Sequence, residues 1–152
     1  MKIKFQKYQG TGNDFIIINN ESLNFPQKNH KLISRLCDRK LGIGSDGLIL
    51  ICPSENSDYE MVYFNSDGNL GSMCGNGARC SVKFAQNNNF IKNQTIFNAC
   101  DGNHSATVVD NKVFLSMKDV LSVKAYAKDL IVNTGSPHYI QVVEELHDFD
   151  VF

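Results

Sequence analysis

The segment MCGNGAR, residues 73–79, places Cys74 directly before Gly75, Asn76 and Gly77, at the start of a helix-forming run. A thiol at a helix start lies at the positive end of the helix dipole, which favours the thiolate. The first backbone N–H groups of that helix can bind a carboxylate, and glycines leave room for it. The segment therefore predicts a thiolate base beside an anion cradle. A lone cysteine at a capping turn can instead be buried and inert.

Three further segments place polar side chains at predicted turns. Asn13 lies in GTGND (10–14), and Asn65 lies in FNSDG (64–68), where its amide offers one acceptor and two donors to a ligand. From local sequence alone, a plain β-turn is the simpler explanation of FNSDG. His138 closes TGSPH (134–138), where it either has a structural role or tunes a nearby thiol.

The segment GIGSDG (42–47) matches G-x-G-x-x-G, the dinucleotide-binding pattern. That pattern requires a preceding strand and a following helix, whereas here a helix precedes and a strand follows. The phosphate-binding helix start is therefore missing, and we reject a nucleotide site. A glycine-rich turn explains the glycines but not the presence of Asp46.

Composition excludes several classes of protein. The chain has 152 residues, 42% hydrophobic and 20% charged, with a net charge of −1. These values are typical of a globular domain. They show no excess of basic residues of the kind that binds nucleic acid or an anionic membrane. The apolar runs are too short to span a bilayer, and the first residues alternate instead of forming a signal peptide. We therefore expect a cytoplasmic protein.

The five cysteines argue against a disulfide framework, because their number is odd and no secretion signal is present. No CxxC pair occurs and the histidines are scattered, so no metal site is predicted. Cys37, Cys52 and Cys80 fall on apolar positions and are predicted to be core residues. Cys100 ends a strand and does not open a helix.

The periodicity of apolar residues predicts an α+β unit of seven strands and two helices up to Met117. The predicted helices are residues 26–41, ended by Gly42, and 76–88. The predicted strands are 2–8, 15–19, 48–52, 59–64, 95–99, 105–109 and 112–117. Two more strands, 130–135 and 139–143, follow. We therefore divide the chain into a domain of residues 1–118 and the incomplete beginning of a second domain, 119–152.

Taken in order, GTGNDF, GIGSDG, FNSDG, MCGNGAR and TGSPH resemble the diaminopimelate epimerases, from the N-terminus to about His138. This group of cofactor-independent enzymes also includes the proline racemases. The resemblance implies two similar α+β domains, each with a mixed or antiparallel sheet around a central helix, and substrate between them. It implies conversion of L,L-diaminopimelate to the meso form, toward lysine and peptidoglycan, with no pyridoxal phosphate, metal or nucleotide. Relatives are often dimers, so a homodimer is compatible with the resemblance.

The resemblance also implies roles for individual residues. Cys74 would be one of two catalytic cysteines, and Gly75 and Asn76 would donate backbone N–H groups to the reacting carboxylate. Asn13 and Asn65 would hold the distal polar end of the substrate.

Three positions have implied roles that are weaker or altered. His138 would modulate the ionisation of the cysteines. Gly47 stands where some relatives carry a substrate-contacting glutamine, so it offers no side-chain contact. Ser136 stands where many relatives carry an asparagine, and only its hydroxyl could replace that contact.

One departure from the family pattern is the missing second cysteine, which in the family opens a helix of the second domain. No cysteine follows Cys100. We therefore expect the isolated chain not to epimerise diaminopimelate. A split enzyme completed by a partner, a non-catalytic amino-acid-binding half-protein and a proline-racemase-like enzyme remain as alternatives. Asn13 and Asn65 favour a substrate with a polar distal end, which proline lacks.

Overall fold

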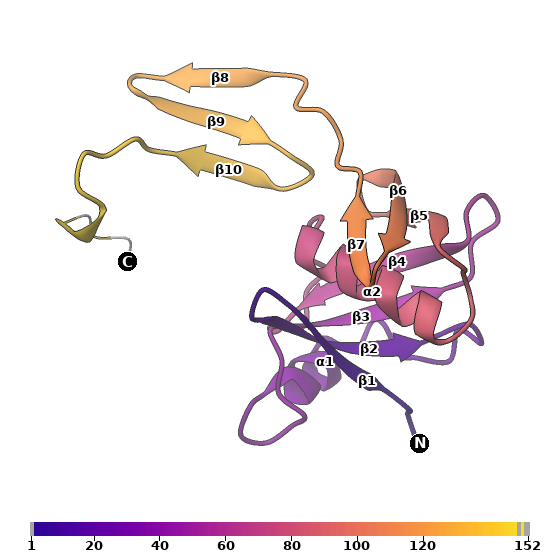
Figure 1. Cartoon of the computed structure of the whole chain (residues 1–152). Helices are drawn as coiled ribbons and strands as arrows, with labels where there is room; N and C mark the ends of the chain where they lie inside the picture. Colours follow the sequence, from indigo (N-terminus) through magenta and orange to yellow (C-terminus); the bar gives the residue numbers. More distant parts are fainter. Residues whose placement is uncertain (1, 149, 151–152) are drawn as a thin grey trace. The chain divides into compact units, whose positions relative to one another are not determined.

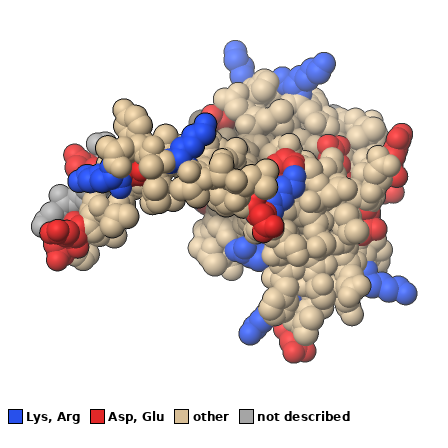
Figure 2. Space-filling model, turned by 90° about the horizontal axis from the view of Figure 1, so that it is seen from above, with Lys and Arg blue, Asp and Glu red and all other residues tan. Residues whose placement is uncertain are grey.

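The structure is a computed structural model that describes residues 2–148 and 150; Met1, Phe149, Val151 and Phe152 lie outside the described part. The chain divides into two compact units, Met1–Met117 and Lys118–Phe152 (Figure 1). Figure 2 shows acidic and basic side chains scattered among uncharged residues over the visible face. None of the helices within residues 2–148 has the length and apolar composition that crossing a membrane requires.

The first unit is a mixed sheet of seven strands that follow one another in sequence order. The strands are β1 (Gln6–Gly10), β2 (Asn13–Asn19), β3 (Gly47–Cys52), β4 (Tyr59–Asn65), β5 (Gln94–Ala99), β6 (Gly102–Val109) and β7 (Lys112–Leu115). Pairs β2–β3 and β4–β5 are parallel and the others antiparallel. Each parallel pair needs a long crossover, and these contain α1 (His30–Cys37) and α2 (Gly75–Asn87). The predicted α+β class is confirmed.

The central strands are buried on both faces, which explains their nearly continuous apolar sequences. Phe15 and Ile17 of β2 belong to the core cluster that includes α2, whereas Ile16 and Ile18 belong to the cluster that includes α1. Helix α2 contacts β1, β2, β3, β4 and β7, so the sheet curls around it (Figure 1). A central helix wrapped by sheet, as the resemblance implied, is therefore present in this unit.

The first helix is shorter than predicted, His30–Cys37 instead of 26–41. The Asn29 side chain accepts from the Leu32 N–H at 3.1 Å and caps the helix after a turn at Pro26. The helix ends before Asp38, whose backbone is extended. Gly42 does not end the helix. It lies where the chain folds back on α1, and a Cβ there would lie 1.9 Å from the Arg35 carbonyl oxygen.

The first strand also differs from the prediction, because its pairing with β2 begins at Gln6, opposite Ile17, and not at residue 2. The turn was predicted over residues 10–14, but only Thr11 and Gly12 lie between the two strands. Their φ angles are 55° and 87°. Positive φ at both positions is typical of a tight hairpin turn.

The second unit holds a three-stranded antiparallel sheet where only two strands were predicted. Its strands are β8 (Val123–Tyr126), β9 (Asp129–Asn133) and β10 (Pro137–Ile140), followed by the short helix η1 (Leu146–Asp148). Strand β8 was missed because it has four residues and enters its turn at Ala127, with φ of 54° and no glycine or asparagine. Many apolar side chains of this sheet are exposed, among them Val123, Ile131 and Ile140.

Candidate active site

Asn13, Gly47 and Asn65 meet at one end of the sheet, on the face that carries α2. Phe15 pairs with Gly47 between β2 and β3, and Gly47 pairs with Asn65 between β3 and β4. Phe15 packs in the α2-side core. Because side chains alternate along strands and paired residues share a face, Asn13, two residues before Phe15, lies on the same face. Three segments far apart in sequence are thus brought together.

Cys74 is the residue that caps α2, so the helix begins one residue earlier than predicted. Its half-buried sulfur accepts a hydrogen bond from the Gly77 N–H at 3.4 Å, and its carbonyl oxygen accepts from Ala78 N–H at 2.8 Å. The sulfur therefore lies directly against the helix N-terminus, where the helix dipole stabilises negative charge.

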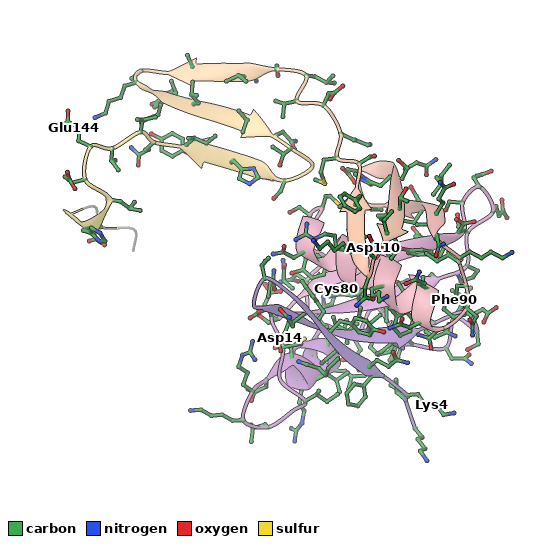
Figure 3. All side chains as sticks on the ribbon, viewed as in Figure 1. Lys4, Asp14, Cys80, Phe90, Asp110 and Glu144 are labelled. Carbon is green, nitrogen blue, oxygen red and sulfur yellow. The ribbon has the colours of Figure 1, made fainter. Side chains whose placement is uncertain are left out.

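The β1–β2 hairpin places Asn13 beside this cysteine. The Asn13 amide nitrogen lies 3.9 Å from the Cys74 sulfur. The Thr11 hydroxyl donates to the Asn76 side-chain oxygen at 3.2 Å, which ties the hairpin turn to the first turn of α2. Figure 3 labels Asp14, which follows Asn13 on β2, and Cys80, which lies on α2. Sequence reasoning placed Asn13 at the distal end of the substrate; the structure places its amide beside the thiol.

Gly75 and Asn76 form the first turn of α2. Their N–H groups precede the first intrahelical bond, which Ala78 makes, so they have no partner within the helix. The Asn76 side chain accepts from Thr11 and Arg79 and is turned back into the protein. A Cβ at Gly75 would meet only Arg79 at 3.6 Å and Met117 at 3.9 Å, both ordinary contact distances, so there is room beside this residue.

Gly47 is buried, and its environment excludes any side chain. A Cβ there would lie 2.5 Å from Cε2 of Tyr63 and 2.6 Å from the Phe64 carbonyl oxygen. Contacts this short do not occur between real atoms, so the strand pairing requires glycine. The space that a side chain of residue 47 would enter is occupied by the Tyr63 ring.

Asn65 ends β4 in a tight turn and is exposed. Its N–H donates to the Asn69 carbonyl and its carbonyl accepts from the Gly68 N–H, each at 2.9 Å. The β-turn interpretation of FNSDG is therefore correct, and the turn leaves the Asn65 amide on the site face. Its substrate contact stays a prediction.

A cluster of charges that sequence reasoning missed joins the start of β2 to the segment before β3. Arg39 donates to Asp14 at 2.7 Å and to Asp46 at 2.8 Å, and Lys7 donates to Asp14 at 2.6 Å. Two further hydrogen bonds, both of 3.0 Å, join the two aspartates. The Asp14 N–H donates to the Asp46 carboxylate, and the Asp46 N–H donates to the Asp14 carbonyl oxygen. The Arg39 hydrogen bond, reinforced by Lys7, holds the pKa of Asp14 well below its usual range.

This charge cluster explains Asp46, which a glycine-rich turn alone did not. Asp14 adjoins Asn13 and Asp46 adjoins Gly47, so the cluster fixes both site segments in register. The signal in the sequence was a pair of aspartates in two separate glycine-rich segments; nothing in the sequence singles out Arg39 among the basic residues between them.

The other two predicted site residues lie in the second unit, in the β9–β10 hairpin. The His138 Nδ1 lies 2.7 Å from the Ser136 carbonyl oxygen, and the imidazole is exposed. The structure thus places Ser136 and His138 next to each other, and their roles at the site stay predictions.

The remaining cysteines differ from Cys74. Cys37, Cys52 and Cys80 are buried, as predicted, and burial raises the pKa of all three, that of Cys80 to about 11. Cys100 is exposed between β5 and β6. Among the described residues, no three His, Cys, Asp or Glu side chains gather as metal ligands would.

Solved structures with this architecture define its class. A hydroxyproline epimerase from Agrobacterium vitis matches with a TM-score of 0.64 and 13% identity, over 86% of this chain and 48% of that one. A phenazine biosynthesis protein of the PhzF family from Bacillus anthracis matches with a TM-score of 0.63 and 14% identity, over 90% and 53%. The fold is therefore the one shared by these proteins.

Sequence comparison identifies the family. Residues 5–121 match the family described as diaminopimelate epimerase. A diaminopimelate epimerase of Flavobacterium psychrophilum is 52% identical over 98% of this chain and 59% of its own length. One from Campylobacter jejuni subsp. jejuni serotype O:23/36 is 37% identical over 97% and 60%. The chain belongs to the diaminopimelate epimerase family, whose members are isomerases, and spans about three fifths of these relatives.

Proposed function

We propose that this chain forms the part of a diaminopimelate epimerase that holds the substrate and supplies the first catalytic cysteine. The reaction converts L,L-diaminopimelate to the meso isomer, in the cytoplasm, toward lysine and peptidoglycan precursors. The observation that carries the proposal is the position of the Cys74 sulfur, which lies between the start of α2 and the amide of Asn13.

The chemistry requires such an arrangement. The α-proton of an amino acid is very weakly acidic, and a positioned base contributes only about 10² to 10⁴ in rate. The developing carbanion therefore needs dipoles aimed at its carboxylate in a water-poor site. The N–H groups of Gly75 and Asn76 would bind that carboxylate, and the Cys74 thiolate would remove the α-proton.

Substrate selection would come from the amides on the site face. Asn65 would bind the distal polar end, and Asn13 would bind substrate while also contacting Cys74. Ser136 and His138, from the second unit, would add a hydroxyl contact and modulate the ionisation of the cysteines. Amides on the site face fit a substrate that is polar at both ends, which proline is not.

Inversion requires a second base on the opposite face of the substrate, where a thiol would return a proton to the carbanion. No cysteine follows Cys100, and the relatives extend well beyond the part that this chain covers. We infer that the uncovered part of the relatives supplies the second cysteine, and that the isolated chain does not epimerise. The exposed apolar side chains of the β8–β10 sheet support a further layer over that sheet.

The test joins this chain to the C-terminal part of the Flavobacterium psychrophilum relative that it does not cover. The chimera should form meso-diaminopimelate and exchange the α-proton with D2O. Cys74→Ala should abolish both, whereas the control Cys100→Ala should retain them. Turnover by the Cys74→Ala chimera would remove Cys74 from the mechanism.

The non-catalytic alternative is tested on the chain alone. Incubation with L,L-diaminopimelate in D2O should give saturable binding without α-proton exchange or meso product. Formation of the meso isomer would contradict our inference that the chain lacks its second base. If the chain binds proline and not diaminopimelate, the proline-racemase-like alternative would be favoured.

A further inference from the structure

The ring of Tyr63 is held between two glycines. A Cβ at Gly47 would lie 2.5 Å from its Cε2, and a Cβ at Gly71 would lie 2.3 Å from its Cδ1. The ring also packs edge-to-face on Phe15, with centroids 5.9 Å apart and an interplanar angle of 78°. Three neighbours therefore fix the ring, so the position of its hydroxyl is also fixed.

The Tyr63 hydroxyl lies on the site face. Tyr63 is two residues before Asn65 on β4, so the two side chains share that face. The hydroxyl oxygen is 3.1 Å from the position of a Cβ on residue 47. Within residues 2–148 and 150, the structure gives this hydroxyl no hydrogen-bond partner, although the residue is half-buried. The oxygen is not among the fully buried unpaired side-chain atoms of the described residues, so it is accessible to water and to a ligand.

We propose that Tyr63 is a substrate-contacting residue, whose hydroxyl donates a hydrogen bond to the distal carboxylate of the substrate. It thereby supplies the polar contact that Gly47 cannot. This inference rests on the proposed function, because it takes diaminopimelate as the ligand. A phenol held in fixed geometry loses little conformational entropy when it binds, which suits it to discriminate a substrate that has a distal carboxylate from one that lacks it.

The electrostatic surroundings support a donor role. Burial raises the pKa of Tyr63 to about 12, and negative charge at Cys74 acts in the same direction. The phenol therefore keeps its proton at neutral pH and can act as a hydrogen-bond donor.

The experiment measures protection of Cys74 from iodoacetamide in the chain as it exists, with alkylation at Cys74 and Cys100 separated by peptide mass mapping. Two ligands are compared, L,L-diaminopimelate and L-lysine, which lacks the distal carboxylate. The variant Tyr63→Phe keeps the ring between the two glycines and removes only the hydroxyl. Tyr126→Phe, at an exposed position on β8, is the matched control.

Tyr63→Phe should raise the diaminopimelate concentration for half-protection about tenfold, as expected for losing a hydrogen bond to a charged group. Half-protection by lysine should be unchanged, and Tyr126→Phe should change neither value. Equal shifts for both ligands, or no shift for either, would overturn the inference while leaving the proposed function intact. If diaminopimelate fails to protect Cys74 in the unaltered chain, the proposed function fails, and the inference with it.

Discussion

The side-chain nitrogen of Asn13 lies 3.9 Å from the sulfur of Cys74, although 61 residues separate them in the chain. Asn13 reaches this position because the tight turn at Thr11 and Gly12 packs against the start of α2. An amide N–H that faces a sulfur stabilises the thiolate over the thiol. Asn13 is therefore placed to act on the reactive group as well as on a substrate.

Replacing Asn13 should change the reactivity of Cys74. Asn13→Ala removes the donor and should slow alkylation of Cys74 by iodoacetamide about threefold, because the thiolate is the nucleophile. Asn13→Asp should slow it further, since a carboxylate repels the thiolate. The rate is measured at Cys74 by mass mapping, with Asn103→Ala on β6 as the control. Equal rates in all variants would show that the Asn13 contact has no electrostatic effect.

Gly47 and Gly75 should respond oppositely to alanine. Gly47→Ala forces a methyl group against Tyr63 and the Phe64 carbonyl, so unfolding in urea should show a loss of roughly 1–3 kcal/mol. Gly75→Ala meets only ordinary contacts in a helical first turn, so stability should be retained or slightly increased. If the Gly75 N–H binds the substrate carboxylate as proposed, the same methyl group should weaken diaminopimelate binding. A stable Gly47→Ala protein would contradict the close packing described above.

Asp14 should make stability depend on pH in the acidic range. Its pKa is depressed in the folded protein by Arg39, so its contribution is fully present above the unfolded pKa, about 3.9. That contribution is lost as the pH falls below this value toward the depressed pKa. Urea midpoints are measured from pH 7 to pH 3. Below pH 4 they should therefore fall less steeply in Asp14→Asn than in the unaltered protein.

Glu55→Gln, in an exposed loop, is the control, because it removes the same charge away from the Arg39 cluster. Parallel pH profiles for the unaltered protein and Asp14→Asn would refute the role assigned to this carboxylate.

His104 should be a stabilising residue of the first unit. It is 3% exposed, contacts Asp101 at 2.9 Å and the Ser116 carbonyl at 3.1 Å, and stacks on Phe97 at 5.6 Å. His104→Ala removes the hydrogen-bond partner of Asp101 and of the Ser116 carbonyl and the ring stacked on Phe97, so it should cost roughly 2–4 kcal/mol in urea unfolding. The exposed His147→Ala should change stability by less than about 0.5 kcal/mol. Similar effects of the two substitutions would contradict this role.

Much of the fold could be predicted from local patterns. The α+β class, the strands from β2 to β7 and the position of α2 follow from apolar periodicity and from turn residues. The errors occurred where an end is set by a distant partner or by a cap. Helix α1 begins at the Asn29 cap and ends before Asp38, and β1 begins where its ladder with β2 begins. Strand β8 carries no turn residue that would mark it in the sequence.

The sequence by itself determined the chemistry available to this protein: a cysteine before a glycine-flanked helix start and amides in glycine-rich turns. Each of these signals spans only a few residues, so local physics is enough to recognise it. Only the tertiary structure decided which of these groups meet. Asn13 beside Cys74, Tyr63 over Gly47 and Arg39 between two aspartates all depend on strand order and on the register of pairing. Those are fixed by burying both faces of the central strands at once, a condition on the whole unit that no single segment encodes.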